Sequence, residues 1–234
     1  MTAAKSSAAE GRIALAVLDM AGTTVDERGS VRSAVLAAID HVTDGNRPEN
    51  FEDIFRRSRG GAKTAMFEAL LGDTDLARHA HTRFEIELEQ LIRSGNVQPI
   101  DGATTTFESL RDRGVKVALT TGFSTTTRGA LLDHLGWTGV VDLVLSPEDV
   151  GRGRPYPDTV LTAVLRLEVD AVQAVAVVGD TANDLFCGTR AGASIVAGVL
   201  TGAHDHDTLT QAPHTHVLDT VAGLIEVIDG PDAS

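Results

Sequence analysis

Cysteine, aromatic residues and positive charge are all scarce in this chain of 234 residues. Cys187 is the single cysteine, so no disulfide can form within the chain, which favours a reducing, cytoplasmic location. The 20 Lys and Arg residues are outnumbered by 33 Asp and Glu residues, which gives a formal net charge of −13. This balance argues against nucleic acid as a partner, because binding to the phosphate backbone draws on clustered Lys and Arg.

Long apolar runs are absent as well. No uninterrupted apolar stretch approaches the roughly 20 residues that a membrane-spanning helix needs, so no membrane partner is expected. Residues 1–12 are small and polar and lack the apolar run of an export signal. We expect flexible tails at 1–12 and 230–234, and a chain long enough for one α/β domain with an insertion.

Short apolar runs alternate with segments of helical spacing through most of the chain. This alternation predicts βαβ units with right-handed crossovers, and therefore an α/β fold with a doubly wound parallel sheet. The predicted strands are 13–18, 115–120, 140–145, 174–179 and 194–200, and the predicted helices are 104–113, 125–135, 158–167 and 184–191.

One segment breaks this alternation. Between about Gly29 and Asn96 no strand is expected, and the spacing predicts four helices separated or ended by glycines. These helices are 31–42, 49–57, 63–71 and 75–93. We interpret residues 29–96 as a helical cap inserted into a core formed by 13–28 and 97–229, and we expect the cap to open and close.

Polar residues follow three of the predicted strands, at the carboxyl ends where open parallel sheets bind ligands. Asp19 follows the first strand, Thr120-Thr121-Gly122 closes the second, and Asp180 follows the fourth. A strand-end carboxylate can attack phosphorus and form an acyl phosphate, provided that a metal ion offsets the repulsion between two anions. Asp19 is therefore a candidate nucleophile.

The carboxylates also predict a magnesium site. Asp180 and Asp184 lie four residues apart on one side of a loop-to-helix turn. Mg²⁺ prefers a few carboxylates, a carbonyl and several waters, and Asp19, Asp180 and the backbone carbonyl of Ala21 can supply the protein ligands. Asp184 can hold a bound water or support the other ligands.

Two further features can bind a phosphoryl group. A hydroxyl of Thr120 or Thr121, together with the free N–H groups near Gly122 at a helix N-terminus, can bind an oxyanion. Arg154, in a loop stiffened by prolines, can reach the phosphoryl oxygens or the nucleophile.

The order of these motifs resembles the haloacid dehalogenase superfamily over nearly the whole chain. The motifs are Asp19-x-x-Gly22-Thr23, Thr121-Gly122, Arg154 before a proline, and Gly179-Asp180-x-x-x-Asp184. The resemblance implies a Rossmann-like core with a helical cap, and a Mg²⁺-dependent hydrolase with Asp19 as nucleophile. It also implies that Thr121 and Arg154 bind the phosphoryl group, that Asp180 and Asp184 bind Mg²⁺, and it suggests a homodimer.

A narrower resemblance concerns the phosphonoacetaldehyde hydrolases of that superfamily. Its phosphatases carry an acid two residues after the nucleophile, whereas Ala21 cannot transfer a proton. The phosphonoacetaldehyde hydrolases also have Asp-x-Ala-Gly-Thr, use Arg at the position of Arg154, and draw a lysine from the cap, where the segment around Lys63 resembles theirs. The resemblance implies that Lys63 forms an imine with an aldehyde and accepts the electrons of the C–P bond as an enamine.

The expected substrate pocket departs from that family at two positions. A His and a Tyr of the family are replaced by Met66 and Phe123. Arginines at 56, 57 and 59 form a basic cluster before Lys63, which we expect to attract an anion and to lower the pKa of the lysine. The predicted substrate-binding residues are Ala21, Gly22, Thr23, Gly122, Phe123, Arg59 and Met66.

Other interpretations stay open at this point. The same residues fit a phosphatase acting on a small phosphate monoester, or a non-catalytic module that binds a phosphorylated ligand. A dehalogenase would share the fold but attack carbon without a metal, which the Asp180 and Asp184 pair disfavours. His204 and His206 are expected to be solvated rather than metal ligands, and Trp137 and Cys187 to be packing residues.

Overall fold

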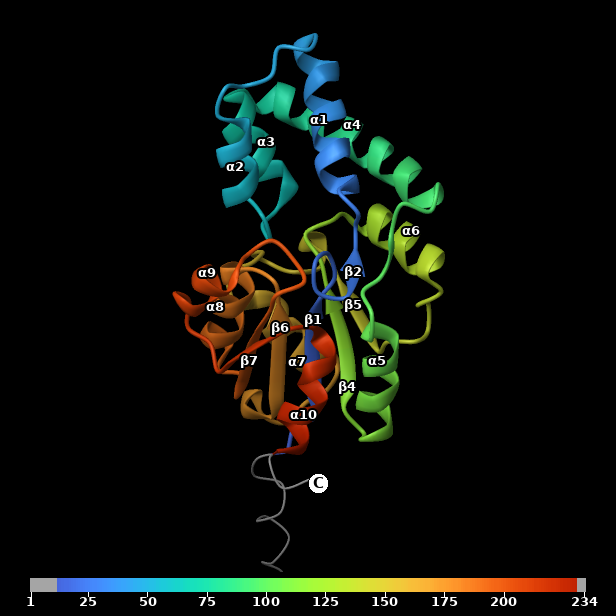
Figure 1. The fold of residues 1–234 in the computed structure, drawn as a ribbon, viewed down its shortest axis with the longest axis vertical. Helices are drawn as coiled ribbons and strands as arrows, with labels where there is room; N and C mark the ends of the chain where they lie inside the picture. The colour runs from blue at the N-terminus through green and yellow to red at the C-terminus, as the bar shows by residue number, and fades with distance from the viewer. Residues whose placement is uncertain (1–11, 231–234) are drawn as a thin grey trace, which may run out of the picture.

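The computed structural model describes residues 12–230, in which an α/β half lies below a separate group of helices (Figure 1). The tails predicted at 1–12 and 230–234 lie outside the described residues, except for Arg12 and Gly230. Within the described part, no helix is both long and apolar enough to cross a membrane.

A six-stranded parallel sheet forms the centre of the α/β half, with the strand order β5-β4-β1-β6-β7-β8. Its strands are β1 (Leu15–Asp19), β4 (Lys116–Thr120), β5 (Leu143–Leu145), β6 (Val175–Gly179), β7 (Ile195–Val199) and β8 (His216–Leu218). Every residue of β1 and β6 is buried, as expected for strands covered on both faces. The sheet confirms the predicted α/β fold.

Helices cover both faces of this sheet. On one face lie α5 (Ala103–Asp112) and α10 (Leu224–Asp229), and on the other α7 (Asp158–Arg166) and α8 (Ala182–Ala191). The remaining elements of this half are α6 (Thr125–Leu135), α9 (His206–Thr210) and the 3₁₀ turns η1 (Pro147–Asp149), η2 (Val172–Ala174) and η3 (Val221–Gly223). Trp137 packs edge-on against Phe107, with ring centroids 5.0 Å apart, and Cys187 is buried in α8.

Four helices form the upper half, which we call the helical lobe: α1 (Ser30–Thr43), α2 (Phe51–Arg57), α3 (Lys63–Leu71) and α4 (Thr74–Arg93). The predicted helices agree with them to within two residues at each end. Phe67 contacts Phe84 edge-on inside the lobe, with ring centroids 5.8 Å apart. Two chain crossings join the lobe to the sheet, where β2 (Val25–Asp26) pairs antiparallel with β3 (Gln98–Pro99).

The structure corrects several predicted boundaries. The strand predicted at 140–145 is shorter in the structure, where only β5 is a strand. The chain turns at Gly139 and enters the sheet after Asp142, whose N–H donates a hydrogen bond to the carbonyl of Val117. Helix α8 begins at Ala182 rather than 184, because Thr181 and Asp184 form a capping box that places the first turn earlier. The pair β2–β3 and strand β8 were not predicted, because two or three residues show no periodicity.

Candidate active site

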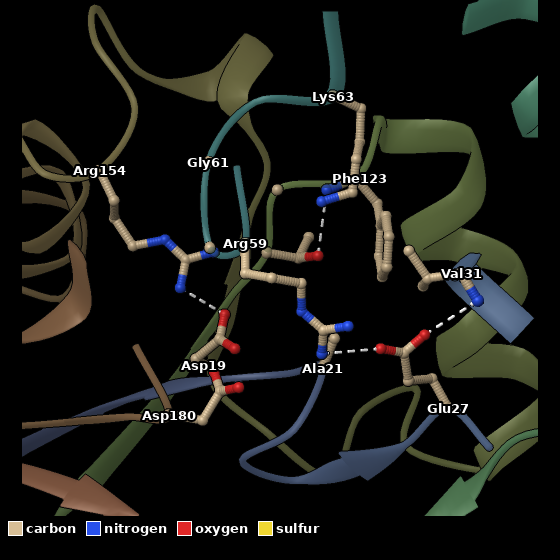
Figure 2. Close-up of a pocket in the computed structure, with 13 residues that line it drawn as sticks. Asp19, Ala21, Glu27, Val31, Arg59, Gly61, Lys63, Phe123, Arg154 and Asp180 are labelled. Atoms are coloured by element: carbon tan, nitrogen blue, oxygen red, sulfur yellow. Dashed lines mark hydrogen bonds and ion pairs between the residues drawn. The ribbon is translucent and has the colours of Figure 1, made fainter. Parts of the chain in front are cut away.

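Loops that follow three strands meet beside one small cavity of about 30 Å³ (Figure 2). Asp19 ends β1, Thr121 and Gly122 follow β4, and Asp180 follows β6. Arg154 enters from the loop before α7. The structure thus brings together the strand-end residues that the sequence singled out.

The carboxylates of Asp19, Asp180 and Asp184 form a buried cluster in which one oxygen of each lies within 4.8 Å of the others. Burial raises the pKa of Asp19 to about 6, although the charge of Arg154 opposes this rise. Burial and the charge of Asp19 raise the pKa of Asp180 to about 8. Three buried carboxylates with one arginine leave an excess of negative charge, which a divalent cation fits.

Glycines allow the backbone to close around Asp180. A Cβ on Gly22, whose φ is +90°, would lie 2.4 Å from Asp180 Oδ2, and a Cβ on Gly202 would lie 2.0 Å from it. The same oxygen accepts a hydrogen bond of 2.6 Å from the N–H of Ala203. Gly22 therefore shapes the acidic cluster and is not among the residues that line the cavity.

Arg154 and Thr121 lie at the nucleophile. A single Arg154 nitrogen, Nη1, donates to Asp19 Oδ1 at 2.5 Å and also contacts Asp184. Thr121 lines the cavity, and its Oγ1 accepts from the N–H of Phe123 at 3.1 Å. Of the two predicted threonines, Thr121 is the one in the cavity, whereas Thr120 pairs with Asp19 within the sheet.

The wall that faces Asp19 comes from the helical lobe. Lys63, the first residue of α3, is buried, and its Nζ lies 5.6 Å from the centroid of the Phe123 ring. Burial, followed by the charge of Arg59, lowers the pKa of Lys63 to about 8. No carboxylate in the described residues forms a salt bridge with this amine. An amine with such a pKa is partly neutral near neutral pH and can attack a carbonyl.

Arg59 also enters the cavity, where it pairs with Glu27, a residue that was not predicted from the sequence. Its Nη2 lies 3.0 Å from Glu27 Oε1, and Glu27 Oε2 accepts a 2.9 Å hydrogen bond from the N–H of Val31. Glu27 and Val31 both line the cavity. The only available signal was position, because Glu27 directly precedes the first crossing to the lobe.

The segment between α2 and α3 rests directly on the α/β half. A Cβ on Gly60 would lie 2.4 Å from Thr181 Oγ1, and a Cβ on Gly122 would lie 2.8 Å from the carbonyl oxygen of Gly61. Asn183 Nδ2 donates to the carbonyl of Arg59 at 3.2 Å. These contacts seat the lobe over the site, with glycines where the two backbones meet.

Other predicted residues lie away from the cavity. Met66 is buried in the hydrophobic core of the lobe, and the hydroxyl of Thr23 is buried without a hydrogen-bond partner in the described residues. Arg56 and Arg57 form ion pairs with Asp53 at the surface, so within the predicted basic cluster only Arg59 lines the cavity. His204 Nδ1 accepts a hydrogen bond of 3.1 Å from the N–H of Ala182, a structural role at the start of α8.

Comparison with known proteins decides the family. Residues 13–192 match the model of the haloacid dehalogenase-like hydrolases. The chain belongs to this hydrolase family. Among curated relatives, a phosphonoacetaldehyde hydrolase of Bacillus cereus is 29% identical over 220 residues, covering 83% of this chain and 78% of the relative. A probable phosphatase, IndB, of Dickeya dadantii is 27% identical over 215 residues, covering 90% of this chain and 91% of the relative.

Solved structures of the family share the fold. A haloacid dehalogenase-like hydrolase of Bacteroides fragilis gives a TM-score of 0.80 at 18% identity, covering 91% of this chain and 100% of that one. A phosphonoacetaldehyde hydrolase-like protein of Oleispira antarctica also gives 0.80, at 23% identity, covering 93% of this chain and 92% of that one. These structures show the shared fold, and the family match over residues 13–192 confirms the predicted resemblance.

Proposed function

We propose that this hydrolase is a Mg²⁺-dependent phosphonatase that cleaves the C–P bond of phosphonoacetaldehyde or a close analogue through an imine on Lys63. The observation that carries the proposal is a buried lysine of lowered pKa facing a buried aspartate across one cavity. Ala21 supports it, because an enzyme without a proton donor at that position suits a leaving group that needs no proton.

The proposed reaction begins at Lys63. Its neutral amine adds to the aldehyde, and the adduct takes up a proton from solvent and loses water to give a protonated imine. Asp19 then attacks phosphorus while Arg154 and Thr121 bind the phosphoryl oxygens. The C–P bond breaks, and its electron pair moves toward the imine nitrogen to give an enamine. Water hydrolyses the aspartyl phosphate to phosphate, and protonation and hydrolysis of the enamine release acetaldehyde.

The acidic cluster would hold the metal ion in this proposal. Asp19, Asp180 and the backbone carbonyl of Ala21 would be ligands, and Asp184 would support them. When bound, Mg²⁺ supplies positive charge that offsets the repulsion between the phosphonate and the carboxylates.

We further propose that the helical lobe acts as a cap over a core formed by 13–28 and 97–229. Support comes from Arg59 and Lys63, which the lobe contributes to the cavity, and from the glycine contacts that seat it on Gly122 and Thr181. Release of the lobe would admit a small phosphonate or phosphate, and reseating would exclude water from the imine.

A second candidate function is hydrolysis of a phosphate monoester in the same cavity. Two observations favour it: Phe123 stands where phosphonoacetaldehyde hydrolases carry a Tyr, and the buried Met66 replaces their His. In this case Lys63 would stay protonated and bind an anionic part of the substrate.

Trapping the imine tests the proposal and separates the two functions. The chain's lysines are Lys5, Lys63 and Lys116, so a reduced adduct is simple to locate. Borohydride added during turnover of phosphonoacetaldehyde is expected to fix a two-carbon adduct on Lys63, detected by peptide mass spectrometry. An enzyme that turns the substrate over with no adduct on Lys63 would contradict the imine route.

A further inference from the structure

Ala21 leaves one chemical role in the site unfilled. The residue two positions after Asp19 has no group that can donate a proton or carry charge, although it lines the cavity beside the nucleophile. Any leaving group that departs as an oxygen anion would need stabilisation from another residue. A cation that lines the same cavity can supply this stabilisation.

Arg59 reaches the cavity from the helical lobe. Figure 2 shows its side chain entering the cavity with the guanidinium directed toward Glu27, and Arg59 lines the same small cavity as Asp19, Ala21 and Asp180. The other cavity cations are placed differently: Arg154 contacts Asp19 directly, and Lys63 lies against Phe123.

Several contacts fix Arg59 in this position. Glu27 holds Nη2 at 3.0 Å, the ring of Phe55 lies 5.8 Å from the guanidinium carbon, and Asn183 binds the backbone carbonyl. The side chain is only 23% exposed. Among the described residues no side chain accepts a hydrogen bond from the remaining guanidinium nitrogens, so these donors are free to bind a ligand.

We propose that Arg59 is the catalytic residue that stabilises the leaving group, and that this site also hydrolyses phosphate compounds whose leaving group departs as a stable oxyanion: aryl, enol and acyl phosphates. Asp19 attacks phosphorus, the P–O bond to the leaving oxygen breaks, and both electrons stay on that oxygen. The guanidinium of Arg59 donates hydrogen bonds to the new oxyanion without giving up a proton. Water then hydrolyses the aspartyl phosphate.

The inference rests on Asp19 as nucleophile, as in the proposed function, but not on the imine of Lys63. Cleavage through an enamine leaves no charge on an oxygen, so it gives Arg59 little to stabilise. Failure of one proposal therefore does not imply failure of the other.

The test is a series of phosphate monoesters graded by leaving group, from nitrophenyl through phenyl to alkyl phosphates, with phosphate release measured in the presence of Mg²⁺. For the unmodified chain we expect kcat to fall steadily as the leaving group becomes more basic. Arg59→Ala is expected to keep most of its kcat on nitrophenyl phosphate. On phenyl phosphate its kcat is expected to fall about 10²-fold, the effect of removing one hydrogen-bond donor that stabilises negative charge. Arg59→Lys should restore part of the loss.

Two control variants sharpen the result. Arg57→Ala removes an exposed arginine of the same lobe, which pairs with Asp53, and should leave the whole series unchanged. Ala21→Asp introduces a proton donor and should raise the rate on alkyl phosphates, flattening the dependence on the leaving group. Binding of beryllium fluoride at Asp19 in each variant shows that the core remains folded.

Three outcomes would overturn the inference. The first is an equal loss for every ester in Arg59→Ala, and the second is a change in KM alone, which would make Arg59 a binding residue. The third is an unmodified chain that releases no phosphate from any ester. Phosphate release from phosphonoacetaldehyde without any ester hydrolysis would refute this inference and leave the proposed function intact.

Discussion

Lys63 shows how one residue's environment decides what it can do. A lysine at the start of a helix is ordinarily exposed and charged, but Lys63 is buried beside Arg59 and Phe123, and its pKa falls to about 8. Burial disfavours the charged form, and the nearby guanidinium adds repulsion. The same chain offers Lys116 as an exposed lysine for comparison.

Replacement of Lys63 is the first prediction at this scale. Lys63→Ala is expected to lose several orders of magnitude in phosphate release from phosphonoacetaldehyde, because the electron sink for the C–P bond is gone. Lys116→Ala is the matched control and should retain the unmodified rate. Substantial turnover by Lys63→Ala would mean that the lysine only binds substrate.

The second prediction concerns pH. Imine formation requires the neutral amine, so kcat/KM for phosphonoacetaldehyde should rise with pH and level off above about 8, the pKa of Lys63. Below that pKa the neutral fraction falls by about tenfold per pH unit. The pH profile of kcat/KM checks this prediction. A rise that continues to pH 10 would mean that the pKa of Lys63 is not lowered.

Residue identities in the site were largely predictable, whereas their contacts were not. Asp19, Thr121, Asp180 and Asp184 were identified because each follows a buried strand or its turn. Glu27 was missed, since an acid in a connecting loop has no periodicity that distinguishes it from a solvated charge. The grouping of arginines 56, 57 and 59 was misleading because sequence adjacency does not show which side chain turns inward.

At the scale of elements, the site depends on how the lobe meets the sheet. The positions of five of the six sheet strands and of the four lobe helices followed from apolar patterning, and the strand order placed the nucleophile at the carboxyl end of β1. The contact of Gly60 with Thr181, and of Gly61 with Gly122, could not be predicted, because it depends on the angle at which two connecting segments bring the lobe down.

A substitution at that contact gives the third prediction. In Gly122→Ala the new Cβ would meet the carbonyl oxygen of Gly61 at 2.8 Å, which should hold the lobe away from the site. We expect kcat/KM to fall by about 10²-fold, the effect of a misplacement of about 1 Å at the reacting groups. Gly129→Ala in α6, with nothing within 4 Å, is the control. Unchanged kinetics in Gly122→Ala would show that this contact is not required.

The whole molecule combines a strongly acidic chain with a site for an anion. The net charge of −13 would repel a phosphonate, so the proposed binding would depend on the local cations Arg59, Lys63 and Arg154 and on a metal at the acidic cluster. The acidic composition was evident from the sequence, but the convergence of three cations from two halves of the molecule required the tertiary structure.

Metal binding gives the fourth prediction, measured on the intact protein. Mg²⁺ at 100 times its dissociation constant should stabilise the folded state by about 2.7 kcal/mol, because it binds carboxylates that only folding brings together. For a chain of this size the melting temperature should rise by roughly 5–10 °C. Asp180→Asn should abolish this shift, and chelation should abolish phosphate release. A melting temperature that does not respond to Mg²⁺ would contradict the metal site.

The most direct test of the proposed function is simultaneous measurement of phosphate and acetaldehyde released from phosphonoacetaldehyde in the presence of Mg²⁺, beside a panel of small phosphate esters. We predict equal amounts of both products from the aldehyde, and none from the Asp19→Asn variant. Phosphate release from esters alone, with phosphonoacetaldehyde left intact, would contradict C–P cleavage and make this hydrolase a phosphatase.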